Sequence, residues 1–301
     1  MRAWFAAFAL VALTAGCGSS SEPMNQRAPS PGSLDALLKG SGKTAAVIPG
    51  NSDFSPGRIR VSFLVVDEQG RVVAPPRARV WVARSRDQKP FGQTIARLES
   101  VGVAGVSSGQ DVKAIYVAEL RVPTPGIYYL VVRPLGPTRV GAIRELLVKS
   151  HSASPAIGSR AYPSQTPTLG STGGNLEELT TRVPPDRELV RYSIAASLAA
   201  HVPFVVTFAT PRYCSSRTCG PVVDVVDRVR RRFSGSHIRF IHVEIYKGNS
   251  PQNGENRWVR EWNLPSEPWT FLVGRDGLIK AKFEGSVSIG ELTAAVGRLL
   301  S

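Results

Sequence analysis

Two cysteines with four residues between them are the residues of this chain most able to do chemistry. They lie in the string Tyr213-Cys-Ser-Ser-Arg-Thr-Cys-Gly-Pro221, and the 301-residue sequence has only one other cysteine, Cys17. A cysteine pair can cycle between dithiol and disulfide, form a permanent crosslink or bind a metal ion. The compartment and the surrounding fold decide between these three roles.

The N-terminus indicates the compartment. One charged residue precedes an apolar run that is too short to span a bilayer, and the run ends in Leu13-Thr-Ala-Gly-Cys17. This resembles a bacterial lipoprotein signal over residues 1–17, with Thr14 where leucine is commoner. The resemblance implies a lipid on Cys17 that anchors the mature chain in the cell envelope. An ordinary cleaved signal is the alternative, and either one places the mature chain outside the cytoplasm, where disulfides persist.

The net charge of +14 raises the possibility of a nucleic-acid partner. The excess is spread over two regions, because residues 58–150 hold 15 basic and 7 acidic residues and residues 191–301 hold 15 and 9. Its densest point, Arg228–Arg232, falls late in a predicted helix, where cations complement the helix dipole. We therefore predict no nucleic-acid partner, and the sequence contains no nucleotide-binding glycine loop that would indicate a cofactor.

Composition divides the remainder into two domains with two polar tracts. Residues 18–57 are rich in Ser, Pro and Gly and predict a flexible tether, and residues 151–189 predict an interdomain linker. Between them, residues 58–150 alternate apolar and polar positions in several short segments, which is typical of a β-sandwich. The stretch Gly126-Ile-Tyr-Tyr-Leu-Val131 resembles an immunoglobulin-like sandwich, although the Cys…Trp…Cys core of that family is absent.

Residues 190–301 predict alternating helices and strands. Helices are expected over 189–200, 222–233 and 288–300, with a short one in 247–263, and strands over 202–209, 238–246 and 270–283, the last interrupted by an Asp-Gly turn. This order, with cysteines at the first strand-to-helix junction, resembles the thioredoxin fold, and more loosely the TlpA-type and lipoprotein branches of that superfamily. The segment Trp262-Asn-Leu-Pro-Ser-Glu-Pro-Trp269 strengthens the resemblance, because Pro268 takes the place of the family's cis-proline.

The resemblance implies a membrane-anchored thiol–disulfide oxidoreductase that acts on envelope protein thiols and disulfides through Cys214, Cys219 and Pro268. The string Cys219-Gly-Pro221 makes Cys219 the attacking cysteine, whereas counting from the end of the strand makes it Cys214. We favour Cys219 as the more acidic thiol, because Pro221 suits the first turn of a helix, and Cys214 as its disulfide partner. Four further residues are candidates for the substrate rim: Tyr213, Trp262, Trp269 and Glu267.

Other features leave alternatives open. Thr207 stands where the family has a buried acid, which puts efficient reductase activity in doubt, and Glu244 and Glu267 are substitutes by type. A non-catalytic binding module with a structural disulfide is one alternative. Copper handling, as in Sco-like proteins, is another, but none of His201, His237 and His242 lies where that family places its histidine ligand, and we predict no metal. Peroxidase activity also stays open.

Overall fold

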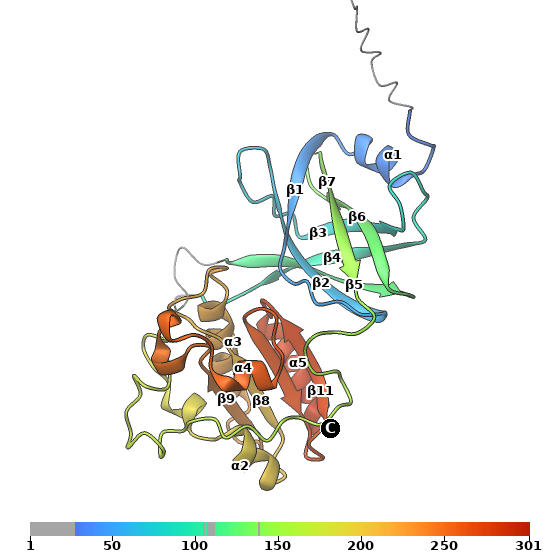
Figure 1. The fold of residues 1–301 in the computed structure, drawn as a ribbon. Coiled ribbons are helices and arrows are strands. Elements are labelled where there is room, and N and C mark those ends of the chain that lie inside the picture. The colour runs from blue at the N-terminus through green and yellow to red at the C-terminus, as the bar shows by residue number, and fades with distance from the viewer. Residues whose placement is uncertain (1–27, 105, 107–111, 138) are drawn as a thin grey trace, which may run out of the picture.

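Two β-sheets organise the chain (Figure 1). The computed structural model describes residues 28–104, 106, 112–137 and 139–301, so the signal and the lipidation site predicted at Cys17 lie outside the described residues. The first sheet is a closed barrel and the second has four strands. In the described part of the chain, no helix is both long and apolar enough to cross a bilayer.

Seven strands close the barrel in the order β1-β2-β5-β4-β3-β6-β7. All neighbours are antiparallel except β1 and β7, which pair in parallel and so complete the ring. Alternate side chains of each strand point inward and form one core that includes Phe63, Tyr116 and Tyr128. The strands are β1 (Lys43–Pro49), β2 (Gly57–Val66), β3 (Arg77–Ala83), β4 (Gly92–Ser100), β5 (Ala114–Val122), β6 (Gly126–Pro134) and β7 (Val140–Val148).

The predicted fold class is therefore wrong. We expected an immunoglobulin-like β-sandwich followed by an α/β thioredoxin-like domain, and the structure has a closed barrel followed by a four-stranded sheet, with strands predominating over helices. A sandwich leaves its two sheets with free edges, whereas here β1 joins β2 to β7 and closes the ring. The alternation of apolar and polar positions predicted strands correctly, but it does not distinguish a sandwich from a closed barrel.

The residues that close the barrel come from the predicted tether. Within 18–57, residues Leu34–Lys39 form α1 and Lys43–Pro49 form β1. The Ser33 side chain caps α1 by accepting from the Ala36 amide, and Leu34 packs with Trp81 on the outside of the barrel. The described part of this segment is thus folded against the barrel.

The second sheet has the order β11-β10-β8-β9. Strands β8 (Phe204–Phe208) and β9 (Arg239–Val243) are parallel, and β10 (Trp269–Val273) is antiparallel to both β8 and β11 (Ile279–Glu284). Helix α3 (Cys219–Arg232) connects β8 to β9, and α5 (Ile289–Leu300) ends the chain. The expected elements over 202–300 are confirmed, and the predicted helix at 189–200 is a 3₁₀ turn (Arg187–Val190) followed by α2 (Ile194–Ala199).

Both faces of this sheet are covered. The side chains of β8 alternate, so Phe204, Val206 and Phe208 face one core and Val205 faces the other. Helices α3 and α5 pack on the Val205 face. The opposite face is covered by α2, by α4 (Arg257–Glu261) and by part of the segment predicted to be a linker.

That segment, 151–189, runs along the second sheet. Ala161 belongs to the core beside β8, and Ser164 accepts a hydrogen bond from Trp262 Nε1 at 3.1 Å. Farther on, Thr180 contacts His242 and the amide of Thr181 donates to Glu244. The segment connects the two sheets as expected, but it is packed rather than free.

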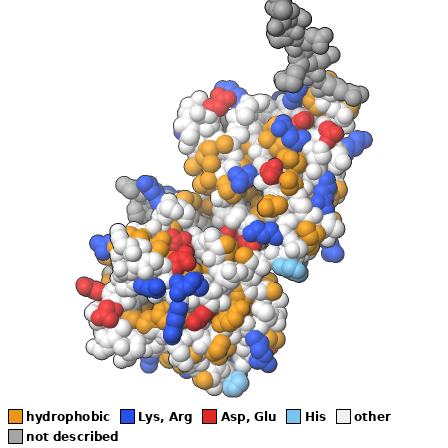
Figure 2. Space-filling model, viewed as in Figure 1, with side chains coloured by type: hydrophobic (Ala, Val, Ile, Leu, Met, Phe, Trp, Pro, Cys, Tyr) orange, Lys and Arg blue, Asp and Glu red, His pale blue; other side chains and the backbone are white. Residues whose placement is uncertain are grey.

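Polar contacts join the barrel to the second sheet. Glu284, the last residue of β11, accepts from the amides of Ser52 and Asp53 at 2.9 and 2.7 Å. Arg60 of β2 forms an ion pair with Glu291 of α5 at 2.6 Å. On the face shown in Figure 2, Lys and Arg side chains occur on both units, interspersed with acidic side chains.

Candidate functional site at the cysteine pair

The two cysteines lie at the junction of β8 and α3. Cys219 is the first residue of α3, and Cys214 lies in the loop before it. Both are free thiols, Cys214 partly exposed and Cys219 buried. Thr218 is the N-cap of α3 but makes no capping hydrogen bond through its side chain, and the amide of Cys219 donates instead to Cys214 Sγ at 3.3 Å. The sulfur of Cys214 therefore occupies the position of a capping acceptor.

Hydrogen-bond donors surround the Cys214 sulfur. The Cys219 thiol and the Ser216 hydroxyl, which lies 3.1 Å away, act with the amides of Cys219 and Thr218. Donors to a thiolate stabilise its charge, and the helix N-terminus adds a favourable dipole. Together, and against the effect of burial, they lower the pKa of Cys214 to about 5. This thiol is ionised at neutral pH.

The environment of Cys219 is the reverse. Its side chain packs in the core with Val222, Val223 and Val226, which share its stripe of α3. Burial, followed by its donation to Cys214 and the negative charges of Cys214 and Glu267, raises the pKa of the Cys219 thiol. Cys219 is therefore a protonated, inaccessible thiol while Cys214 is a thiolate.

The prediction that Cys219 is the more acidic thiol is accordingly wrong. It assumed that Cys219 would lie before the helix with its sulfur exposed. The helix begins at Cys219 itself, so this side chain turns into the core and the helix amide points to Cys214. The alternative alignment, counted from the end of the strand, identifies the acidic thiol.

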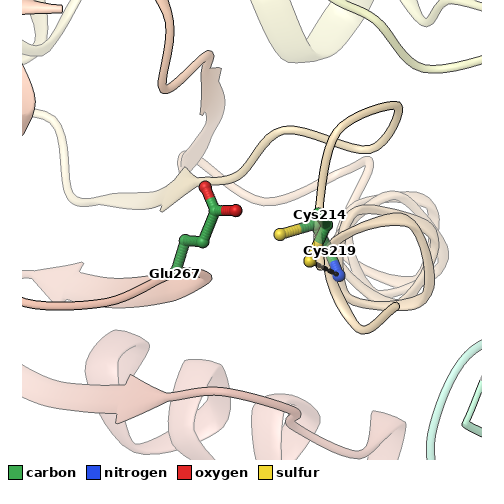
Figure 3. A group of neighbouring side chains, drawn as sticks. All are labelled: Cys214, Cys219 and Glu267. Carbon is green, nitrogen blue, oxygen red and sulfur yellow. Dashed lines mark hydrogen bonds between the residues drawn. The ribbon is translucent and has the colours of Figure 1, made fainter. Parts of the chain in front are cut away.

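Glu267 faces the two sulfurs from the segment just before β10 (Figure 3). One donor atom from each of Cys214, Cys219 and Glu267 lies within 4.8 Å of the other two. The peptide bond between Glu267 and Pro268 is cis, as predicted. Burial, and after it the charge of Cys214, raises the pKa of Glu267 to about 8.

The four predicted rim residues have different environments. Tyr213 is exposed and meets Tyr246 edge to face, with ring centroids 6.3 Å apart, and Glu267 faces the sulfurs. Trp262 and Trp269 are 0% and 1% exposed and pack on Phe271, so the prediction that they form a rim is wrong. Their indole N–H groups donate to Ser164 and Ser266, which satisfies them inside the core.

Of the two residues predicted to substitute for the family's buried acid, Glu244 and Glu267, only Glu267 lies at the sulfurs. Thr207 is buried and hydrogen-bonded to Thr270, 3.1 Å away on β10. Glu244 Oε1 accepts from both the amide and the hydroxyl of Thr181, which directs that oxygen to the 151–189 segment. Glu267 is therefore the acid at the sulfurs, and the sequence had indicated it only by residue type, together with Glu244.

Two sulfurs and one carboxylate are donors that zinc accepts, but they are fewer than the four protein ligands of a structural zinc site. The histidine required by the copper alternative is not with them. His242 is buried, and its ring nitrogens contact Thr180 Oγ1 at 3.2 Å and the carbonyl of Ala209 at 3.0 Å. His201 lies beside Arg275, and His237 is exposed on the turn before β9.

Comparison of the structure with solved proteins finds similar chains, among them one from the thioredoxin family. No family model and no curated protein matches the chain. Among solved structures, a "thiol:disulfide interchange protein, thioredoxin family protein" from Chlorobium tepidum TLS is similar at 14% sequence identity and a TM-score of 0.31. The similarity covers 48% of this chain and 100% of that chain. A similarity this distant assigns neither a family nor a function to this chain.

Proposed function

We propose that this chain catalyses thiol–disulfide exchange, with Cys214 as the attacking thiol and Cys219 as the resolving thiol. One observation carries the proposal: neighbouring sulfurs have opposite environments, one partly exposed and ionised, the other buried and protonated. Exchange needs a thiolate to attack a substrate disulfide and a second thiol to release the mixed disulfide. The pair supplies both.

The reaction has two balanced steps. In the first, Cys214 Sγ⁻ attacks a disulfide R–S–S–R′, a Cys214–S–S–R bond forms, and R′S⁻ leaves. In the second, Cys219 loses its proton and its sulfur attacks Cys214 Sγ, the Cys214–Cys219 disulfide forms, and RS⁻ leaves. Two electrons pass from the cysteine pair to the substrate, and the reverse sequence oxidises a substrate dithiol.

We place this reaction in the cell envelope, where the substrates are protein thiols and disulfides. The sequence Leu13-Thr-Ala-Gly-Cys17 supports this location, because it resembles a lipoprotein signal with Cys17 as the lipidated residue. The anchor is tested by membrane fractionation of a Cys17→Ala variant, which should leave the membrane fraction. A variant as firmly bound as the parent protein would contradict the anchor.

Trapping of mixed disulfides tests the exchange reaction. The Cys219→Ser variant keeps the attacking thiolate without its resolving partner, so we expect it to accumulate mixed disulfides with envelope proteins, visible on non-reducing gels. The matched Cys214→Ser variant keeps only the buried thiol and should trap almost none. More trapping by Cys214→Ser would reverse the roles. No trapping, together with a parent disulfide whose potential lies below about −300 mV, would identify a structural crosslink instead.

A further inference from the structure

Among the described residues, no hydrogen bond or ion pair explains the position of the Glu267 carboxyl group. Its side chain leaves the segment before β10 and points to the sulfurs of Cys214 and Cys219 (Figure 3). Within the described residues, its Oε2 is buried and makes no hydrogen bond. An unsatisfied buried carboxyl oxygen costs free energy, so a role at the sulfurs is the simplest reason for its presence.

The groups around Glu267 favour its protonated form. Burial acts first, and the charge of Cys214 acts second, followed by those of Glu244 after β9 and Glu255 before α4. Tyr246 and Cys219 also face this cluster, and the pKa of each is raised first by burial and further by the Glu267 charge. With a pKa of about 8, Glu267 carries a proton at neutral pH while Cys214 is a thiolate.

We propose that Glu267 is the proton donor and acceptor of the exchange reaction, an inference that rests on the function proposed above. Its carboxyl oxygen and the two sulfurs lie within 4.8 Å of one another, a separation that one bridging water or a side-chain rotation spans. It reaches both reacting sulfurs from a segment that contains neither cysteine.

Protons then balance over the two steps. When Cys214 attacks R–S–S–R′, the protonated Glu267 gives its proton to R′S⁻, and R′SH leaves. Glu267 is now a carboxylate, and it takes the proton of Cys219 as the Cys219 sulfur attacks Cys214. The disulfide forms, RS⁻ leaves and takes its proton from solvent, and Glu267 is again protonated.

The change in charge at Cys214 matches this cycle. Formation of the mixed disulfide removes the thiolate charge, which is the second-largest cause of the raised pKa of Glu267. The pKa of Glu267 therefore falls at the step in which it must be a base. The Cys219 thiol is buried in the core, so a carboxylate beside it is a nearer proton acceptor than bulk water.

A reagent with two strongly acidic leaving thiols separates the two steps. Reduced protein is mixed with 5,5′-dithiobis(2-nitrobenzoate), which releases one coloured thiolate when Cys214 attacks and a second when Cys219 resolves. Because this thiolate needs no proton to leave, Glu267→Gln should not slow the first release. The second release should slow by about a hundredfold at pH 7, the scale of general acid–base catalysis, and its pH profile should move to alkaline pH.

Glutathione disulfide, whose thiolates are much more basic, is the second probe, and with it Glu267→Gln should slow the first step as well. Glu68→Gln, which neutralises an exposed carboxylate in the turn after β2 of the barrel, is the control and should leave both releases close to the parent rates. A second release from Glu267→Gln at the parent rate and with the parent pH profile would overturn the inference. A parent protein that gives no second release would overturn the proposed function itself.

Discussion

At the scale of single residues, the acidity of Cys214 comes from its place at the start of α3. An oxygen of Ser, Thr, Asn or Asp usually accepts the first free amides of a helix, and here the sulfur of Cys214 does so. A negative acceptor gains more from this position than a neutral one, because both the amide and the helix dipole favour its charge. The Cys219 thiol lowers the pKa of Cys214 most, and the amide contact that positions the Cys214 sulfur lowers it further.

The Ser216 hydroxyl is a second donor whose contribution can be measured. We expect Ser216→Ala to raise the pKa of Cys214 by about one unit, since a hydrogen bond to a charged group contributes about 1.5 kcal/mol. The rate of alkylation by iodoacetamide, followed against pH, should rise to a plateau with a midpoint near pH 5 in the parent and at higher pH in the variant. Ser215→Ala, at the neighbouring exposed serine, is the control. An unchanged midpoint in Ser216→Ala would show that the Ser216 hydroxyl does not contribute and that the Cys219 thiol and the helix amides set this pKa.

The sequence predicted the cysteine pair and offered Glu244 and Glu267 as candidate acids, but it did not predict which acid faces the sulfurs or which thiol is exposed. Pro221 was read as marking the first turn of a helix that begins after Cys219, whereas α3 begins two residues before the proline. That difference decides burial, because Cys219 then shares one helical stripe with Val222, Val223 and Val226. Helix boundaries are set by local hydrogen bonds that a periodic pattern does not resolve.

At the scale of elements, prediction succeeded where one pattern spans a whole helix or strand. The segment of β8 was predicted from a short apolar run, and that of α5 from apolar positions at helical spacing. It failed for β1 and for the 151–189 segment, which lack such a period. These segments are held by long-range contacts, such as the parallel pairing of β1 with β7 and the hydrogen bond from Trp262 to Ser164.

Helix α5 begins with a capping box formed by Ser288 and Glu291. Ser288 Oγ accepts from the amide of Glu291, and the Glu291 side chain accepts from the amide of Ser288, both at 3.1 Å. We expect Ser288→Ala to lower the free energy of unfolding by about 1 kcal/mol, because it removes one half of this capping box. Urea unfolding measures the change, and Ser301→Ala at the other end of the same helix is the control. Equal effects of the two substitutions would show that the cap is not stabilising.

At the scale of the whole molecule, the barrel and the second sheet meet through backbone groups as well as side chains. Gly285 follows Glu284, which accepts hydrogen bonds from the amides of Ser52 and Asp53. The Gly285 amide donates to the carbonyl of Pro268 at 2.8 Å. Its φ is +71°, and a Cβ at this position would lie 2.0 Å from the carbonyl oxygen of Gly50 in the barrel unit. Glycine is therefore required at 285 both by backbone conformation and by the approach of the two units.

Gly285→Ala should destabilise the contact between the two units by more than the cost of placing alanine in a left-handed backbone conformation. Gly70 offers a matched control, because its φ is +75° and a Cβ there would contact nothing within 4 Å. Both substitutions should cost about 1–2 kcal/mol for a left-handed alanine, but only Gly285→Ala also forces the Gly50 backbone away. In a Trp81→Phe background, we expect its urea unfolding to separate into two transitions, one seen by the fluorescence of Trp258, Trp262 and Trp269 in the second unit and one by circular dichroism of the barrel. A single transition that coincides with that of Gly70→Ala would mean that the contact at Gly50 does not couple the two units.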